Sequence, residues 1–206
     1  MTSLTTPRLA GLAVSLWLIA VAGAGYLGLF EALPFQAVPP LAMVGVVVPI
    51  LVYVASPGLR SAMRGVGLWW ITAVHVIRIP AALLFFAYLD EGLLPQSFVT
   101  NAGWGDFAAG VLALGALIVA TRGAYWAMHV FGAADFVVAV GTGTALTLAG
   151  HAGMSTMATY PLVVIPLFLV GTLAFTHLAA FHLLLTGRAS DAPSDARMAG
   201  PQAGRV

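Results

Sequence analysis

The stretch formed by residues 68–89 most constrains the fold of this chain, because it is long enough to cross a bilayer and carries an arginine at its middle. An α-helix rises about 1.5 Å per residue, so roughly 20 apolar residues cross a hydrocarbon core about 30 Å thick. Arg78 then lies about 15 Å from the start of the stretch, near the midplane. A guanidinium there costs at least about 2.5 kcal/mol unless it is paired or hydrated. Arg78 is therefore expected to face the protein interior, beside an acceptor.

The composition agrees with a membrane protein and excludes several other classes. Of the 206 residues, 61% are hydrophobic and 7% are charged, whereas about a quarter of the residues of a soluble domain are charged. The net charge of +1 provides no basic footprint for nucleic acid. The chain has no cysteine, which excludes disulfides, iron–sulfur clusters and thiolate metal sites. It also has no lysine to form a Schiff base.

Six apolar segments are long enough to cross a membrane, so the predicted fold is an all-α bundle of six transmembrane helices within residues 1–187. Pro80 has no N–H to donate to the carbonyl of Val76, so a kink is expected beside Arg78. The polar stretch 188–206 is predicted to be a disordered cytoplasmic tail. The predicted helices cover about residues 9–30, 38–55, 68–89, 106–121, 124–148 and 160–186.

The arginines predict the orientation of this bundle. If the N-terminus is cytoplasmic, every arginine except Arg78 falls on the inner side of the membrane, whereas Glu31, Asp90 and Glu91 fall outside. Such a bias follows the positive-inside rule. The sequence therefore predicts a multi-pass protein of the inner membrane with both termini in the cytoplasm and the lipid bilayer as its surroundings.

Three ionisable residues on three predicted helices share one depth. Asp135 lies about 16 Å along its helix and His177 about 14 Å along its own, close to the depth of Arg78. A carboxylate at the midplane is as costly as an arginine, and the least costly arrangement pairs the two. His75, one turn from Arg78 on nearly the same face, is expected to offer a ring nitrogen as a hydrogen-bond acceptor.

Two interpretations of this group remain open. A buried Arg–Asp pair with a histidine neighbour can hold three helices in register without any further role. Ionisable residues inside a membrane also mark ion paths, proton relays and ligand pockets. In that case Arg78 would bind an anionic or carbonyl group, and His177 would exchange protons.

Two further histidines allow a different interpretation. His129 and His182 lie about 7 Å and 6 Å from the cytoplasmic ends of their helices, so their matched depth would suit a bis-histidine haem b. Outside this alternative no cofactor or metal is expected. The competing interpretation places both side chains at the lipid headgroups.

Asp106 is predicted to begin the fourth helix at the outer face, where a carboxylate stabilises the positive end of the helix dipole. The alternative is an outer gate, in which Asp106 binds a cation together with Asn101 or His151.

The arrangement of several motifs resembles a group of small uncharacterised bacterial integral membrane proteins. The resemblance covers residues 68–177, and in that group an arginine, a Gly-Asp pair, an aspartate and a histidine recur at positions that correspond to Arg78, Asp106, Asp135 and His177. It implies a bacterial six-helix membrane protein but no reaction. The motifs are HVIRIPAALLFF, GLLPQSF, NAGWGDFAAG, FGAADFVVAVGTG and PLVVIPLFLVGTLAFTH.

Three functions from different classes fit these observations. The leading hypothesis is a transporter for a small molecule or for protons, centred on Arg78, Asp135 and His177. The second is a b-type cytochrome that passes electrons to quinone. The third is a non-catalytic accessory or assembly subunit of a membrane complex. The possible protein partners are a second copy of the chain or the subunits of such a complex. No nucleophile–base motif, acidic metal cluster or phosphate-binding loop favours an enzyme.

Overall fold

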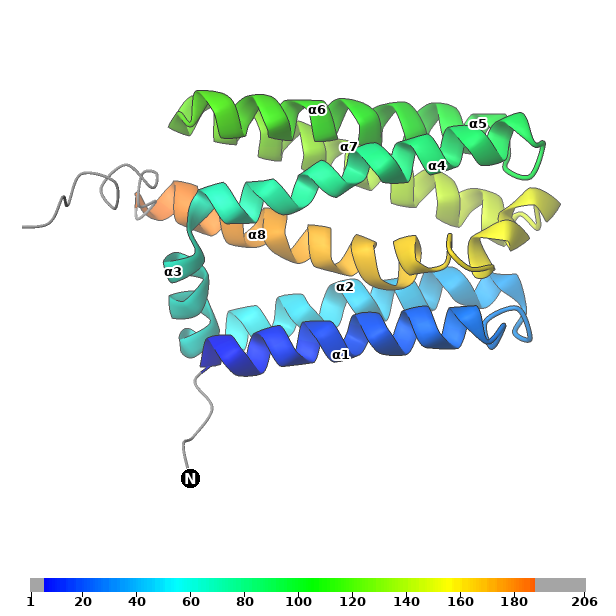
Figure 1. The fold of residues 1–206 in the computed structure, drawn as a ribbon, viewed down its shortest axis with the longest axis horizontal. Helices are drawn as coiled ribbons and strands as arrows, with labels where there is room; N and C mark the ends of the chain where they lie inside the picture. The colour runs from blue at the N-terminus through cyan, green and yellow to red at the C-terminus, as the bar shows by residue number, and fades with distance from the viewer. Residues whose placement is uncertain (1–5, 188–206) are drawn as a thin grey trace, which may run out of the picture.

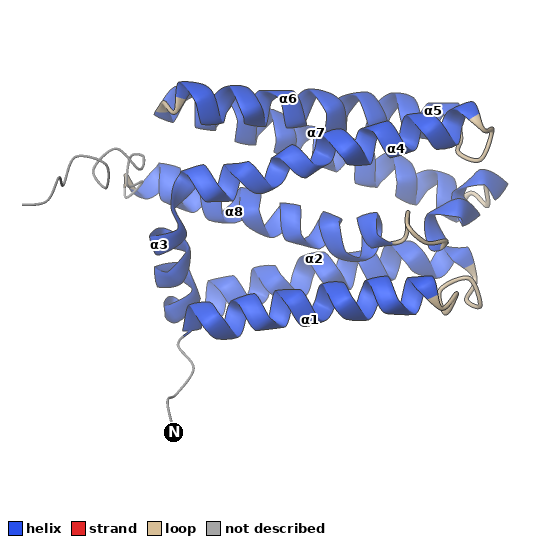
Figure 2. Ribbon diagram, viewed as in Figure 1, coloured by secondary structure: helices blue, strands red, loops and turns tan. Residues whose placement is uncertain are grey.

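The structure is a computed structural model in which residues 6–187 are described, and within that range it contains only helices, turns and loops. Six of its helical segments are long and apolar enough to cross a membrane. They lie along one another in a single bundle (Figures 1 and 2). The predicted all-α class is therefore confirmed for the described residues, while the predicted tail, 188–206, lies outside them.

The first two long helices are α1 (Thr6–Tyr26) and α2 (Val38–Ala55), which lie together at one edge of the bundle (Figure 1). The predicted bounds of α2 are confirmed. The first helix was predicted to reach residue 30, but it ends at Tyr26, and Gly28 turns the chain with a φ of 71°. Glycine adopts this conformation without the steric cost that a side chain would add.

The third long segment contains α3 (Pro57–Ala73) and α4 (Arg78–Asp90). Gly67 has φ 79° and ψ 162°, which breaks α3. The helix α3 begins across one end of the bundle, and α4 runs along the bundle (Figure 1). The predicted segment 68–89 lies within the candidate membrane span Pro57–Asp90. The irregularity expected near Pro80 is a 3-10 turn, Val74–Ile77, directly before Arg78.

The fourth long segment corrects the sequence-based prediction. Residues 90–105 were expected to form a loop that leads to the fourth helix. Instead α5 (Gln96–Phe98), a π-helical turn (Val99–Gly103) and α6 (Trp104–Val119) form one continuous helical segment. Asp106 therefore lies about 15 Å from the start of this segment instead of at its end.

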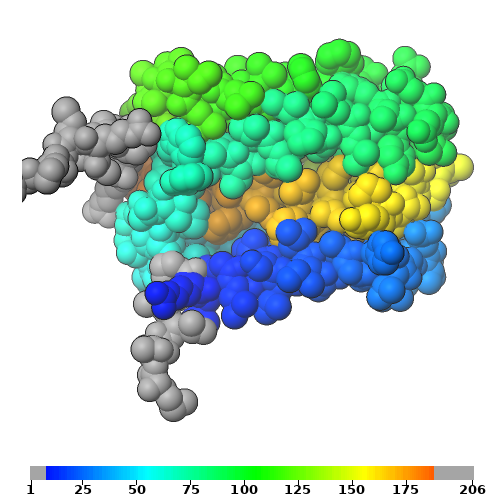
Figure 3. Space-filling view, in the orientation of Figure 1, coloured from blue at the N-terminus to red at the C-terminus, as the bar shows by residue number. Residues whose placement is uncertain are grey.

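The last two long helices are α7 (Arg122–Leu148) and α8 (Val170–Thr186). The bounds predicted for α7 are confirmed to within two residues. The sixth helix was predicted to start at residue 160, but residues 160–163 form turns, and a π-helical turn, Ile165–Leu169, leads into α8. On the face shown in Figure 3, the band between α1 and α4 is filled by α8 (orange) and by residues that precede it (yellow).

Small residues let these helices approach closely. A Cβ atom added at Gly171 of α8 would lie 2.2 Å from the backbone oxygen of Gly45 on α2. At Gly110 of α6 it would lie 3.1 Å from the backbone nitrogen of Ile79 on α4. Close approach of this kind is typical of helix packing in membranes.

Arg60 and Arg122 lie at the end of the bundle where α3 begins. Arg60 donates to the backbone oxygens of Tyr53 and Val54 at the end of α2. Arg122 donates to the oxygen of Leu184 near the end of α8. These cations stabilise the negative ends of two helix dipoles. The described chain also begins and ends at this end of the bundle (Figure 1).

Candidate functional site

Arg78 is the first residue of α4 and is almost fully buried, with 1% of its surface exposed. Its Nε donates to Oδ1 of Asp106 on α6 at 2.5 Å. One terminal nitrogen donates to Oδ2 of Asp135 on α7, and the other donates to the backbone oxygen of Gly132 at 3.1 Å. We call Arg78, Asp106 and Asp135 the arginine centre. All three nitrogens of the guanidinium thus have an acceptor on a neighbouring helix.

Asp135 reaches Arg78 only because α6 carries a glycine opposite it. A Cβ atom at Gly105 would lie 1.5 Å from Oδ1 of Asp135. No side chain larger than hydrogen fits there while the carboxylate keeps its place. The Gly-Asp sequence at 105–106 therefore serves both ion pairs, since it admits Asp135 and supplies Asp106.

Asp106 was predicted to cap a helix at the outer face, and this prediction is wrong. Its side chain is 14% exposed and is paired with Arg78 inside the bundle. The sequence holds a signal that would have found it, because Asp106 lies on a stripe of small and apolar residues at helical spacing. In the structure all of these neighbours are buried. The stripe is formed by Phe98, Ala102, Asp106, Ala109, Ala113 and Ala116.

The arginine centre carries an excess of negative charge when both carboxylates are ionised. Arg78 contributes +1 and the two aspartates contribute −2, which leaves −1. An uncompensated charge in a low-dielectric interior is costly. The centre therefore favours a proton or another cation nearby.

Two cavities meet at Asp106. A larger one, of about 90 Å³, extends from Asp106 between α2, α7 and α8 to Met154 and Met157. A smaller one, of about 40 Å³, lies against Asp106 and Arg78. A water molecule needs roughly 10–15 Å³ by this measure, so both cavities have room for water. The residues common to the two cavities are Asp106, Ala139, Val140, Ile165 and Val170.

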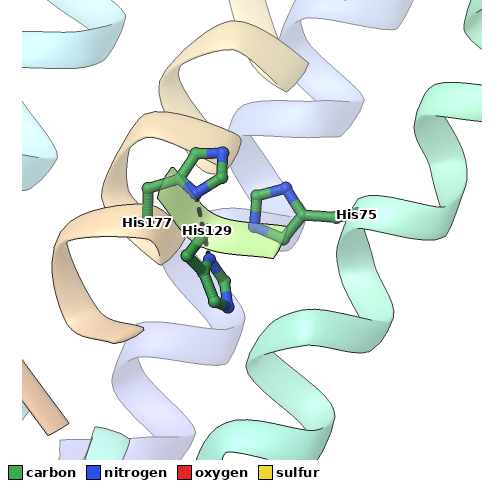
Figure 4. Close-up of side chains that lie close together, drawn as sticks. All are labelled: His75, His129 and His177. Atoms are coloured by element: carbon green, nitrogen blue, oxygen red, sulfur yellow. Dashed lines mark hydrogen bonds between the residues drawn. The ribbon is translucent and has the colours of Figure 1, made fainter. Parts of the chain in front are cut away.

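Three histidines lie together beside this centre (Figure 4). His75 comes from the 3-10 turn before α4, His129 from α7 and His177 from α8, and all three are buried. The ring centroids of His75 and His177 are 4.2 Å apart, and the other two pairs are 5.1 and 5.2 Å apart. Nδ1 of His129 lies 3.0 Å from Nδ1 of His177. We call these residues the histidine cluster.

Two threonines bind the histidine cluster from outside. Oγ1 of Thr72 lies 3.0 Å from Nε2 of His129, and Oγ1 of Thr176 lies 3.1 Å from Nε2 of His75. Nδ1 of His75 and Nε2 of His177 are buried and have no hydrogen-bond partner among the described residues. Two ring nitrogens of the cluster are therefore free to bind something else.

Gly132 joins the two groups. A Cβ atom there would lie 2.8 Å from Cε1 of His177 and 3.1 Å from a terminal nitrogen of Arg78. The histidine cluster and the arginine centre thus share one wall of α7.

Comparison with known proteins identifies the family. Residues 35–185 match a family described as "Domain of unknown function (DUF8737)". The chain belongs to the DUF8737 family. The DUF8737 match covers α2 to α8, and so includes the whole arginine centre and histidine cluster. No curated protein and no solved structure gave a match. The predicted resemblance to small bacterial membrane proteins stays a prediction.

The structure brings together only part of the group predicted around Arg78. Arg78 and Asp135 are paired, but the hydrogen bond of His177 goes to His129. His75 lies near Arg78 in the chain as expected, and its ring nitrogen is bonded to Thr176.

His129 was expected at the lipid headgroups, but none of its surface is exposed. Its ring lies against Thr72, His177 and Phe181, which come from other helices. His182 is bonded to the hydroxyl of Tyr53 at 2.7 Å. His129 and His182 thus have different partners, and the haem b interpretation stays a prediction that a visible spectrum would decide.

Proposed function

We propose that this chain is a membrane transport protein in which the arginine centre takes up protons and passes them across the bilayer. The observation that supports this most is the position of Asp106. It is paired with Arg78 and also lines both cavities. A proton that arrives through water in either cavity therefore reaches a carboxylate of the ion-pair network directly.

The shared arginine gives the centre two arrangements. When both carboxylates are ionised, Arg78 divides its hydrogen bonds between Asp106 and Asp135. A proton on Asp106 removes one of the two attractions, so the guanidinium is then held by Asp135 and the oxygen of Gly132. Because the two carboxylates lie on α6 and α7, protonation changes how strongly α4 is held to each helix. Relays of ionisable side chains are typical of proton-linked membrane transporters.

The larger cavity supplies the proposed entrance. It is lined mostly by apolar side chains, with the hydroxyls of Thr144 and Thr147 on one wall and Asp106 at one end. Its other end lies at Met154 and Met157, in the helical turn after α7. Arg60 and Arg122 lie at the opposite end of the bundle, where α3 is. By the positive-inside rule, the entrance would then face away from the cytoplasm, across the inner membrane.

Proton flux into liposomes tests this function. The purified protein is reconstituted, a membrane potential is imposed with potassium and valinomycin, and a trapped pH-sensitive dye reports proton uptake. We expect faster uptake than in empty liposomes. Asp106→Asn should return the rate to that of empty liposomes, because the amide cannot carry the proton. Asp90→Asn is the matched control, since Asp90 is exposed at the end of α4.

Two results would contradict the proposal. One is a rate for the wild-type chain equal to that of empty liposomes. The other is undiminished uptake through Asp106→Asn, with reconstitution of both variants verified by their amount and helix content.

A further inference from the structure

We propose that the histidine cluster, His75, His129 and His177, is a binding site for one divalent first-row transition-metal ion of the zinc and copper class. Imidazole is a common protein ligand for these ions. The proposal goes beyond proton transport and does not depend on it.

The spacing of the ring nitrogens fits a shared ion. One nitrogen from each histidine lies within 4.8 Å of the corresponding nitrogens of the other two. Zinc binds histidine nitrogen at about 2.0–2.1 Å, so two nitrogens on one tetrahedral ion lie about 3.3 Å apart. Nδ1 of His129 and Nδ1 of His177 are already 3.0 Å apart. The three rings come from separate segments, and their centroids lie between 4.2 and 5.2 Å apart (Figure 4).

The unpartnered nitrogens point to a ligand. Nδ1 of His75 and Nε2 of His177 have no hydrogen-bond partner among the described residues. Both residues are buried, since none of His75 and only 4% of His177 is exposed. Buried polar atoms nearly always have a partner, and each exception calls for an explanation. An ion bound through Nδ1 of His75 explains that free nitrogen, because a neutral imidazole offers its lone pair to a metal. His177 contributes only one of its two nitrogens to the same ion.

Two threonines hydrogen-bond ring nitrogens of the cluster in the way that residues behind metal-binding histidines do, and we call them outer supports. Histidines that bind a metal usually have their other ring nitrogen bonded to an oxygen, which fixes the ring and its tautomer. Thr72 does this for His129, and Thr176 does it for His75. The hydroxyl of Thr176 also donates to its own helix, so its position is fixed.

The neighbouring charges favour a cation. Gly132 brings His177 close to Arg78, but the arginine centre as a whole carries −1 when both carboxylates are ionised. The chain offers no thiolate, so a nitrogen-only site is expected to select zinc, copper, nickel or cobalt. Three protein ligands leave a fourth position open for water or another ligand.

Metal analysis of the full-length protein tests the proposal. The detergent-purified chain is stripped with a chelator, incubated with Zn²⁺ or Cu²⁺, freed of excess ion and analysed by mass spectrometry. We expect about one ion per chain, as for a single three-histidine site. His129→Gln and His177→Gln should remove it. His182→Gln and His151→Gln are matched controls, because these two histidines lie outside the cluster, and they should keep it.

Spectroscopy and a threonine variant separate a metal site from a purely structural cluster. Copper-loaded protein should show electron paramagnetic resonance splittings from imidazole nitrogens. Thr72→Val should keep one site but weaken metal affinity about 10–100-fold, the usual effect of losing an outer support. Thr172→Val is the control, because that hydroxyl bonds only the oxygen of Phe168 among the described residues.

Two results would overturn the proposal. The first is a wild-type chain that binds neither Zn²⁺ nor Cu²⁺ at one ion per chain. The second is unchanged binding by His129→Gln and His177→Gln, which would place the ion elsewhere. If those variants fail to fold, the wild-type measurement and Thr72→Val decide alone. Proton flux plays no part in this test. A chain that binds no metal would therefore contradict the metal site and leave the proposed proton transport unaffected.

Discussion

Nε of Arg78 lies 2.5 Å from Oδ1 of Asp106, and this ion pair joins the start of α4 to the first turns of α6. The two residues are 28 positions apart in the chain. Both side chains are largely buried. Without Arg78, Asp106 would be left as an uncompensated buried charge, whereas Arg78 without Asp106 would keep its ion pair with Asp135. Removing one partner from a buried pair typically costs about 3–5 kcal/mol. The position of α6 along α4 is therefore set by charge as well as by packing.

Gly105→Ala should disturb the second ion pair of Arg78. The added methyl group would lie 1.5 Å from Oδ1 of Asp135, so the carboxylate must move. We expect a loss of about 1–3 kcal/mol in the free energy of unfolding, as for other overpacked sites. Gly115→Ala on the same helix meets nothing within 4 Å and should not destabilise. Unfolding by denaturant in detergent measures both, and equal stabilities of the two variants would contradict the close contact.

Ala139→Leu should block the route to the arginine centre without removing any ionisable group. Ala139 lines both cavities, so a larger side chain there occupies the space in which water would lie. We expect proton uptake in liposomes to fall to the rate of empty liposomes. Val137→Leu is the control, because Val137 lies on the same helix and is 70% exposed. Undiminished flux through Ala139→Leu would show that protons take another route.

Much of the fold could be predicted because length and hydropathy determine where helices cross a membrane. The α2 helix has its predicted bounds, and the predicted third segment, 68–89, begins directly after Gly67, where α3 is broken. The start of the fourth segment was missed because Gly103 and Gly105 suggest a loop. Their role is instead close packing against Phe86 and Asp135. A sequence alone does not distinguish a glycine that allows a close contact inside a helix from a glycine that ends a helix.

The candidate site could be predicted only in part. Depth along each helix identified Arg78 and Asp135 as partners. Depth could not show that His177 turns toward His129, because this depends on how α7 and α8 are rotated against each other. It also misplaced His129, whose burial results from side chains contributed by other helices. The rotation of one helix against another, and the side chains that other helices place over a residue, depend on how the whole bundle packs. Neither can be read from the periodicity of a single segment.

The orientation of the chain can be tested by labelling, since it has no cysteine of its own. Ser61 is exposed on α3, and Ser155 is exposed in the turn after α7. We expect a membrane-impermeant maleimide to label Ser155→Cys in intact cells whose outer membrane has been opened. Ser61→Cys should react only after the inner membrane is permeabilised. The reverse pattern would contradict the positive-inside assignment.

Removal of metal should lower the stability of the bundle. A ligand that binds only the folded state at 100 times its dissociation constant stabilises that state by about 2.7 kcal/mol. We expect the midpoint of thermal unfolding to rise with added Zn²⁺ and to fall when a chelator removes it. His129→Gln should show the same midpoint under both conditions. A wild-type midpoint that ignores both zinc and chelator would contradict binding to the folded histidine cluster.

The most direct test of the account is a double-mutant cycle on Arg78 and Asp106. The free energy of unfolding is measured for the wild type, Arg78→Gln, Asp106→Asn and the double variant, with Asp90→Asn in place of Asp106→Asn as the control cycle. Because the two side chains are buried partners, we expect a coupling energy of about 1–3 kcal/mol for Arg78 with Asp106, and additive effects for Arg78 with Asp90. Additive effects in both cycles would show that Arg78 is not held by Asp106, and the proposed proton centre would be contradicted.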